Sequence, residues 1–308
     1  MLIFNKLYFE FKIFNRLLRQ FCLKIPKNKW KITKKEERLI EDLLSPKIDY
    51  VFKRIFGHVG NEEITANLLS SILKKKISDL VLDANPILEK DLYDDKVGIL
   101  DIKAKIDNSI NCNIEMQIVD RKDIEKRILF YWSKMYSGSI KEGDKYNILG
   151  KNIIILISDY ELKSLRNIPK YITKWNIREE EYQKVILTDV MEIYIIEVPK
   201  FSKYKKKEKQ KELNNWIEFI ESPEVITMNE SNEAIKKAKE VLEEISQDEH
   251  ERYLAELREK YIRDQWAIED AGYEKGVEAV AKKLKNKGMD ITTIVEVTGL
   301  TKEEIEDL

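Results

Sequence analysis

Residues 97–119 read VGILDIKAKIDNSINCNIEMQIV, and their pattern is the strongest indication of the fold. In its first half, apolar and polar residues alternate from Val97 to Ile106, which is the period of a β-strand with one buried face. Its second half alternates in the same way from Cys112 to Val119, and residues 107–111 between them have the composition of a turn. The stretch therefore predicts an antiparallel hairpin with one apolar and one polar face.

The polar face of the predicted hairpin carries two acids and one amide, Asp101, Glu115 and Gln117. With the turn centred near Ser109, Asp101 lies opposite Gln117, and Glu115 lies diagonal to Asp101 at about 5 to 8 Å. Two carboxylates at that spacing repel each other unless protons or a cation intervene. A hard cation such as Mg²⁺ takes oxygen ligands and acidifies a bound water, which Gln117 is placed to orient. The spacing leaves two alternatives open, a metal site and a plain solvated polar face.

The sequence around the hairpin predicts a mixed α/β core. Apolar residues recur at helical spacing over residues 61–73, and residues 123–137 also have a helical pattern. Residues 152–158 (NIIILIS) are typical of a short, fully buried strand, and residues 185–198 hold more β-type sequence. A helix, a hairpin, a helix and two strands in this order place the core from about Ser45 to Pro199.

After Pro199 the pattern is helical to the end of the chain. Apolar residues step by three and four in two stretches, which are Ile235, Ala238, Leu242 and Ile245, then Leu254, Leu257 and Tyr261. This spacing is the seam of a helix pair, so we expect the C-terminal helices to form a homo-oligomer; the alternative is that the stripe packs on the core of the same chain. Gly288 and Gly299 stand where helices end, and residues 301–304 are a capping box. Residues 291–308 have a helix-turn-helix outline, and their acidity favours a structural helical hairpin over a DNA reader.

Composition excludes several classes of protein. A chain of 308 residues is long enough for about two domains of roughly 150 residues, or one domain with a large appendage. The 2 His and the 2 Cys, Cys22 and Cys112, exclude a zinc finger or a disulfide framework and fit a reducing, cytoplasmic location. No apolar run approaches the roughly 18 to 20 uncharged residues that span a bilayer, so we expect no stable membrane insertion.

The chain begins with a basic segment that differs from the rest. Residues 1–35 contain ten Lys or Arg and one acid, Glu10, interleaved with bulky apolar residues. The basic residues break every apolar run into short pieces, which excludes a secretion signal. We expect residues 1–43 to be a poorly ordered basic extension; a basic amphipathic arm for a membrane surface or nucleic acid is the alternative.

Several blocks along the chain resemble one known family. They are residues 49–57 (DYVFKRIFG), 98–101 (GILD), 113–117 (NIEMQ), 127–136 (RILFYWSKMY) and 195–201 (IIEVPKF). Together with Gly288, Ile291 and residues 298–300 (TGL), they resemble the PD-(D/E)XK nuclease family transposases, also called recombination-promoting nucleases or the Rpn family. The resemblance runs from about residue 44 to residue 308. It implies an α/β, restriction-endonuclease-like mixed sheet flanked by helices over residues 44–201, followed by an all-helical C-terminal region over residues 202–308.

The resemblance also implies roles for the hairpin residues. Asp101 is then the motif aspartate, although Leu100 precedes it instead of proline, and Glu115 is the second acid. Both would bind Mg²⁺ or Mn²⁺ together with the backbone carbonyl of Met116. Gln117 stands in the place of the superfamily's lysine, and an amide can hydrogen-bond a water but cannot lend it a positive charge. Slow or lost catalysis therefore stays open.

Three further residues are candidates for binding the substrate. Lys53, at the entry to the first predicted helix, is placed to meet a phosphate, and Arg127 and Tyr131 share one helix face after the hairpin. A structural lysine and an Arg–Tyr surface pair are the alternatives.

The sequence thus predicts a metal-dependent DNA endonuclease that hydrolyses phosphodiester bonds in DNA recombination or mobile-element activity. One competing hypothesis is a catalytically inactive DNA-binding or protein-assembly module on the same fold. The other is a protein-interaction scaffold that works through its helical tail.

Overall fold

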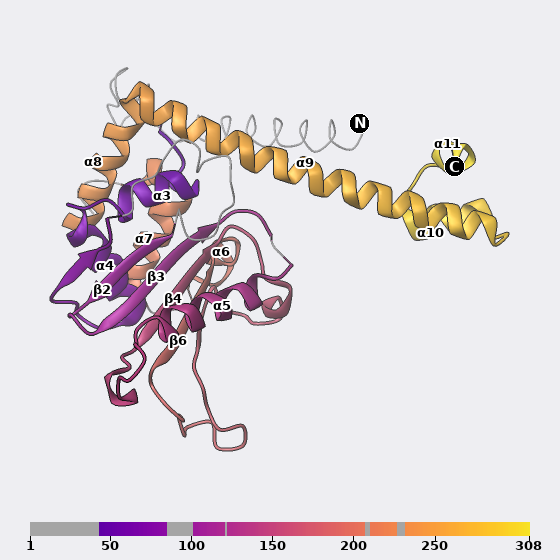
Figure 1. Ribbon diagram of the computed structural model, residues 1–308. Helices are drawn as coiled ribbons and strands as arrows, with labels where there is room; N and C mark the ends of the chain where they lie inside the picture. The colour runs from indigo at the N-terminus through magenta and orange to yellow at the C-terminus, as the bar shows by residue number, and fades with distance from the viewer. Residues whose placement is uncertain (1–42, 85–100, 121, 207–209, 227–231) are drawn as a thin grey trace. The chain divides into compact units, whose positions relative to one another are not determined.

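One mixed β-sheet runs through the part of the chain that the structure describes, which is residues 43–84, 101–120, 122–206, 210–226 and 232–308 of a computed structural model (Figure 1). Its strands are Leu80–Leu82 (β1), Ile102–Ile106 (β2), Ile110–Gln117 (β3), Asn152–Ser158 (β4), Ile172–Trp175 (β5) and Met191–Glu197 (β6). They lie in the order β1-β2-β3-β4-β6-β5. β3, β4 and β6 run parallel to one another, and β1, β2 and β5 pair antiparallel with their neighbours. The predicted mixed sheet is confirmed.

Helices precede, interrupt and follow the sheet along the chain. Those described are Asp49–Phe56 (α3), Glu62–Leu73 (α4), Ile124–Ser137 (α5), Phe201–Tyr204 (α6), Lys211–Glu221 (α7), Glu233–Gln247 (α8), Glu249–Asn286 (α9), Ile291–Thr298 (α10) and Lys302–Asp307 (α11). α4 and α5 confirm the predicted helices over residues 61–73 and 123–137. The sequence missed α3, because its 8 residues are too few for a helical period to stand out. Within the described residues, no helix is long and apolar enough to cross a membrane.

The turn of the hairpin β2–β3 is tight. Asp107 and Asn108 both adopt positive φ, 47° and 56°, which Asp and Asn tolerate better than other residues with a side chain. The chain therefore reverses within a few residues, and Ile106 pairs with Ile110.

This turn changes the register that the sequence predicts. Ile102 pairs with Ile114, and the same register continued by one step sets Asp101 against Glu115. The expected pairing of Asp101 with Gln117 is therefore wrong, because moving the turn centre by one residue moves the pairing by two. Residues 97–100 of the predicted first strand lie outside the described residues.

One face of the sheet, which carries Ile102 and Ile114, lies under α3 and α4. α3 contacts β3, α4 contacts β1, and α7 packs against α4. At the end of α3, a Cβ on Gly57 would lie 2.9 Å from Cγ1 of Ile102, so glycine allows the helix to approach the strand closely. This contact brings α3 to the end of the hairpin where Asp101 lies.

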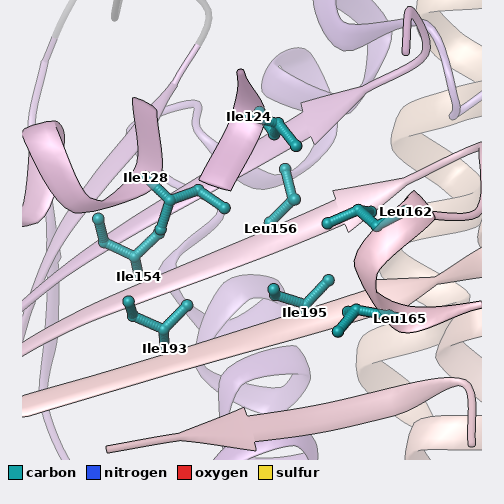
Figure 2. Packing of buried hydrophobic residues seen from close by; sticks show 8 residues of the cluster. All are labelled: Ile124, Ile128, Ile154, Leu156, Leu162, Leu165, Ile193 and Ile195. Carbon is teal, nitrogen blue, oxygen red and sulfur yellow. The ribbon is translucent and has the colours of Figure 1, made fainter. Parts of the chain in front are cut away.

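The opposite face is divided between an apolar and a polar half. α5 packs on β4 and β6 through a cluster of buried side chains (Figure 2) that comprises Ile124, Ile128, Ile154, Leu156, Leu162, Leu165, Ile193 and Ile195. Every residue of β4 is buried, which confirms the predicted fully buried strand. On the same face, β2 and β3 carry Lys103, Asn113 and Glu115, because Asn113 pairs with Ile154 across the β3–β4 ladder.

The apolar stripe of α8 packs on the core of the same chain. Its members Ile235, Ala238, Leu242 and Ile245 are buried, and α8 contacts both α3 and α4. The first of the two apolar stretches therefore packs on the core of its own chain, which was the alternative to self-association. At the end of the chain, Gly288 and Gly299 have φ of 79° and 73°, and Thr301 forms the predicted capping box. Ala281, Ile294 and Ile305 join α9, α10 and α11 in a small cluster of their own.

Other expectations from the sequence are wrong or lie outside the described residues. β1 and β5 were missed because they have 3 and 4 residues and pair on one side only, at the two edges of the sheet. β6 begins at Met191, so residues 185–190 do not belong to it. The predicted basic extension lies outside the described residues as far as residue 42. Residues 44–308 form one compact unit, and the division expected between residues 201 and 202 stays a prediction.

Candidate active site

The hairpin brings two carboxylates together in the protein interior. Asp101 directly precedes β2 and Glu115 lies in β3, and only 6% and 2% of their surfaces are exposed. A plain solvated polar face, one of the two alternatives from the sequence, is therefore excluded for this pair.

The protonation of the two carboxylates reflects this burial. Burial raises the pKa of Glu115 and the nearby charge of Asp101 raises it further, while Arg127 opposes both effects. Burial also raises the pKa of Asp101, against a hydrogen bond from Asn113 and the charges of nearby cations. The pair therefore resists being doubly ionised unless additional positive charge enters the site.

One oxygen of Glu115 already accepts two hydrogen bonds. Nη2 of Arg127, on α5, donates to Oε1 of Glu115 at 2.7 Å, and the side-chain amide of Gln117 donates to the same oxygen. The guanidinium of Arg127 lies 5.5 Å from the ring centroid of Tyr131. The structure thus brings four predicted site residues, Glu115, Gln117, Arg127 and Tyr131, into one contact network.

Asn113 is a residue of this site that the sequence analysis missed. It is buried, and its Nδ2 donates to Oδ2 of Asp101 at 3.3 Å. Its Oδ1 is buried too and has no hydrogen-bond partner among the described residues. The available signal was its place on the polar face of the hairpin, two residues before Glu115; alternation alone does not tell which polar residues of a face are buried.

Helix α3 supplies a cation and a third acid to the same region. Lys53 is 5% exposed, and its charge lowers the pKa of Asp101 against the larger effect of burial. Lys53 lies inside α3 and not at the entry to a later helix, as the sequence analysis placed it. Asp49, one turn earlier, is buried, and its charge contributes to the raised pKa of Glu115, after the larger effects of burial and Asp101.

Helix α9 holds α3 through two sets of ionic contacts. The guanidinium of Arg258 binds both carboxylate oxygens of Asp49. Its Nε lies 2.9 Å from Oδ1 and 3.0 Å from Oδ2, and its Nη2 lies 2.6 Å from Oδ2. Glu251 accepts hydrogen bonds from the Tyr50 hydroxyl and from Nε of Arg54, both at 2.8 Å. No sequence pattern could indicate these contacts, because about 200 residues separate the partners.

The donor atoms of this site fit a hard divalent cation. Within the described residues, no group of three or more His, Cys, Asp and Glu is placed to hold a metal ion. Asp101 and Glu115 nevertheless offer two carboxylates, and Mg²⁺ is commonly bound by one or two carboxylates while it keeps several waters. A cation beside Glu115 would also relieve the repulsion between the two acids.

A family model described as PD-(D/E)XK nuclease family transposase matches residues 46–271 of the chain. The chain belongs to this family. A search of the curated proteins found no match, and a search of the solved structures found none either. The family membership confirms the resemblance drawn from the hairpin and the helices around it. The mixed six-stranded sheet with its flanking helices and helical C-terminal region is consistent with the restriction-endonuclease-like fold of PD-(D/E)XK nucleases.

The family also supports a nuclease in general terms, with divalent metals as the usual cofactors of PD-(D/E)XK enzymes and DNA as the suggested partner. The match includes every predicted site residue, from Lys53 to Tyr131. The individual roles assigned to those residues, including the carbonyl of Met116, stay predictions.

Proposed function

We propose that the protein is a metal-dependent DNA endonuclease that hydrolyses phosphodiester bonds with Mg²⁺ or Mn²⁺. The observation that carries the proposal is the buried pair of Asp101 and Glu115, whose pKa values are both raised. Burial of two neighbouring acids destabilises the metal-free fold. A bound cation relieves their repulsion, and the free energy released contributes to the affinity for the metal. The family is one of nuclease-type transposases, which supports a role in DNA recombination or mobile-element activity. A cytoplasmic location is part of the same proposal.

Asp101 and Glu115 would hold the cation, and the carbonyl of Met116 would be a further oxygen ligand. The cation, when bound, acidifies a water and stabilises negative charge on the phosphate. Asn113 fixes the orientation of the Asp101 carboxylate through its Nδ2. Gln117 would orient the water through a hydrogen bond between the water and its side-chain amide. In this structure that amide donates to Glu115.

Arg127 and Lys53 supply the positive charge that Gln117 lacks. Arg127 neutralises Glu115, and its Nε is buried without a hydrogen-bond partner among the described residues. That N–H group has no hydrogen bond to lose to a phosphate oxygen of the substrate, but because it is buried the side chain has to shift for the contact to form. Lys53 adds a second buried cation from the opposite side of the hairpin. Tyr131 keeps the guanidinium in place through its ring.

The second candidate function is a catalytically inactive DNA-binding or assembly module. The contacts of Glu115 favour it, because Arg127 and Gln117 together satisfy one carboxylate oxygen without any metal. Incubation of the protein with supercoiled plasmid in Mg²⁺, Mn²⁺ or EDTA separates the two functions. Metal-dependent nicking or linearisation supports the endonuclease; binding to the plasmid in a gel shift with no cleavage in either metal supports the inactive module.

Self-association of the C-terminal helices also stays a proposal. Since the stripe of α8 is used within the chain, we place the contact with a second copy on exposed apolar residues of α9, which include Trp266, Ile268 and Tyr273. Light scattering of the full chain at micromolar concentration tests this. A dimer mass that Trp266→Ser and Ile268→Ser convert to a monomer supports the proposal, and a monomer mass for the parent contradicts it.

A further inference from the structure

A groove of about 640 Å³ opens beside Asp101, between the hairpin and α5. The hairpin contributes Lys103, Lys105 and Asn113 to its lining, and α5 contributes Tyr131, Lys134 and Met135. Its volume is in the range of pockets that enclose a single small ligand, roughly 300 to 1,000 Å³. The groove is thus large enough for a single nucleotide.

The charge of the groove suits a nucleic-acid backbone. Lys103, Lys105 and Lys134 are exposed, and none of them forms an ion pair with the part of the chain that the structure describes. The groove also contains two acids, Asp101 and Asp83, one of which belongs to the candidate metal site. Lysines along a groove bind phosphates without regard to sequence and position the strand.

Asn113, which lines the groove, also holds a buried acceptor that has no hydrogen-bond partner among the described residues. Nδ2 of Asn113 donates to Oδ2 of Asp101 at 3.3 Å, which leaves Oδ1 as the unpartnered atom of the amide. A buried acceptor of this kind gains free energy from a ligand that brings a hydrogen-bond donor. Every unpaired base has donors on its Watson–Crick edge, whereas a paired base has already used them.

The α5 wall adds a surface on which a base can pack. Tyr131 is half-buried and Met135 lies one turn further along the same face of α5, so both contribute apolar surface to the groove. Aromatic side chains beside a basic groove are the usual arrangement for binding single strands, because each base has a face that stacks.

We propose that this groove binds an unpaired nucleotide of single-stranded DNA next to the phosphate that lies at Asp101 and Glu115. The proposal rests on the proposed endonuclease function, for which it names the substrate class. Lys103, Lys105 and Lys134 bind the flanking phosphates, the base packs against Tyr131 and Met135, and Oδ1 of Asn113 accepts a hydrogen bond from its Watson–Crick edge.

The test is fluorescence anisotropy with the full chain in EDTA, where cleavage is silent. The probes are a labelled 16-nucleotide strand that cannot pair with itself, the same strand annealed to its complement, the same strand with abasic sites, and the RNA strand of the same sequence. We expect the single DNA strand to bind at least about 10-fold tighter than the duplex. Abasic sites should weaken binding by about 5-fold or more, as expected for the loss of base stacking.

Protein variants locate the effect. Lys103→Ala with Lys105→Ala should weaken binding of the single strand by about 10- to 100-fold and reduce its dependence on salt. The matched control is Lys170→Ala with Lys184→Ala, which removes two exposed lysines that do not line the groove; it should bind like the parent. Tyr131→Ala should abolish the difference between the normal and the abasic strand.

Equal affinity for single strand and duplex, tighter binding of the RNA strand, or no effect of the groove variants would each overturn the proposal. These outcomes leave the endonuclease untouched, because plasmid cleavage in Mg²⁺ is measured separately. Conversely, groove-dependent binding of single strands without any cleavage contradicts the endonuclease and supports the groove.

Discussion

The sheet face beneath α5 has two halves with opposite chemistry, although their strands are neighbours in one ladder. In the β4–β6 half, Ile154 and Leu156 pack against α5 as part of the apolar cluster. Their ladder partners in the β2–β3 half are Asn113 and Glu115, which are equally buried but carry an amide and a carboxylate. The polar half therefore gains less free energy from burial than the apolar half and stabilises the fold less.

The apolar half of the face stabilises the fold, whereas the polar half carries the groups suited to chemistry. A carboxylate that is buried without a full set of partners raises the free energy of the fold, and such groups gather at functional sites. We therefore expect substitutions in the polar half to change activity with little loss of stability, and substitutions in the apolar half to do the reverse.

Asp101→Asn should have the largest effect of all. It keeps the shape of the side chain but removes the charge that a cation needs, so plasmid cleavage in Mg²⁺ should fall by several orders of magnitude. The free energy of unfolding should stay unchanged or rise, because repulsion from Glu115 is relieved. Urea unfolding and a plasmid assay measure the two quantities. The control is Asp189→Asn, an exposed acid in the loop before β6, which should match the parent; cleavage by Asp101→Asn at the parent's rate would show that the assignment is wrong.

Leu156→Ala tests the apolar half at the position that pairs with Glu115. Leu156 is fully buried in the cluster under α5, so the change should lower the free energy of unfolding by about 2 to 5 kcal/mol. Cleavage per folded molecule should stay within a few-fold of the parent. Leu187→Ala, at a leucine that is 78% exposed, is the control and should cost little. If Leu156→Ala abolished cleavage at temperatures where it is fully folded, the two halves would not be separable.

Gln117→Ala should reduce cleavage by about 10- to 100-fold, because it removes a neutral group that orients the water and not a charge. Gln117→Lys is the sharper variant, since it restores the charged group of the wider superfamily at the same place. If Arg127 and Lys53 already supply the missing charge, Gln117→Lys should give no gain over the parent. A large gain in the plasmid assay would instead show that the parent lacks a cation at this point.

The sequence predicted the polar half less completely than the apolar half. The apolar run over residues 152–158 predicted a buried strand, and these residues form the fully buried β4. The alternation of the hairpin gave the correct faces, but Asp107 and Asn108 form a tighter turn than the composition of residues 107–111 could specify. The resulting shift in strand register sets Asp101 beside Glu115. The hydrogen bond from Asn113 to Asp101 depends on that register, so the sequence did not indicate it.

Contacts made at long range were beyond the sequence altogether. Asp49 belongs to the block of residues 49–57 that resembles the family, yet nothing local marks it as the partner of Arg258 on α9. Arg127 was predicted to bind the substrate, and its helix face alone did not indicate a bond to Glu115. That bond depends on how α5 packs on β4, which many distant residues determine together.

The smallest expected effect is a pH dependence that the polar half alone should produce. The folded pKa of Glu115 lies above its unfolded value of about 4.3, so the folded state holds a proton that the unfolded state releases. The stabilisation is fully present below the unfolded pKa and is lost as pH rises through the raised folded pKa. The melting temperature of the metal-free protein should therefore fall by a few degrees between pH 5 and pH 9. Glu115→Gln, which cannot ionise, should remove this part of the slope, whereas Leu156→Ala should lower the whole curve and leave its slope unchanged.

Added Mn²⁺ should raise the melting temperature most at the alkaline end, where both acids are ionised and can bind it. A parent and a Glu115→Gln protein with parallel pH profiles would show that Glu115 titrates normally, and that the two halves of the face do not differ in the way proposed.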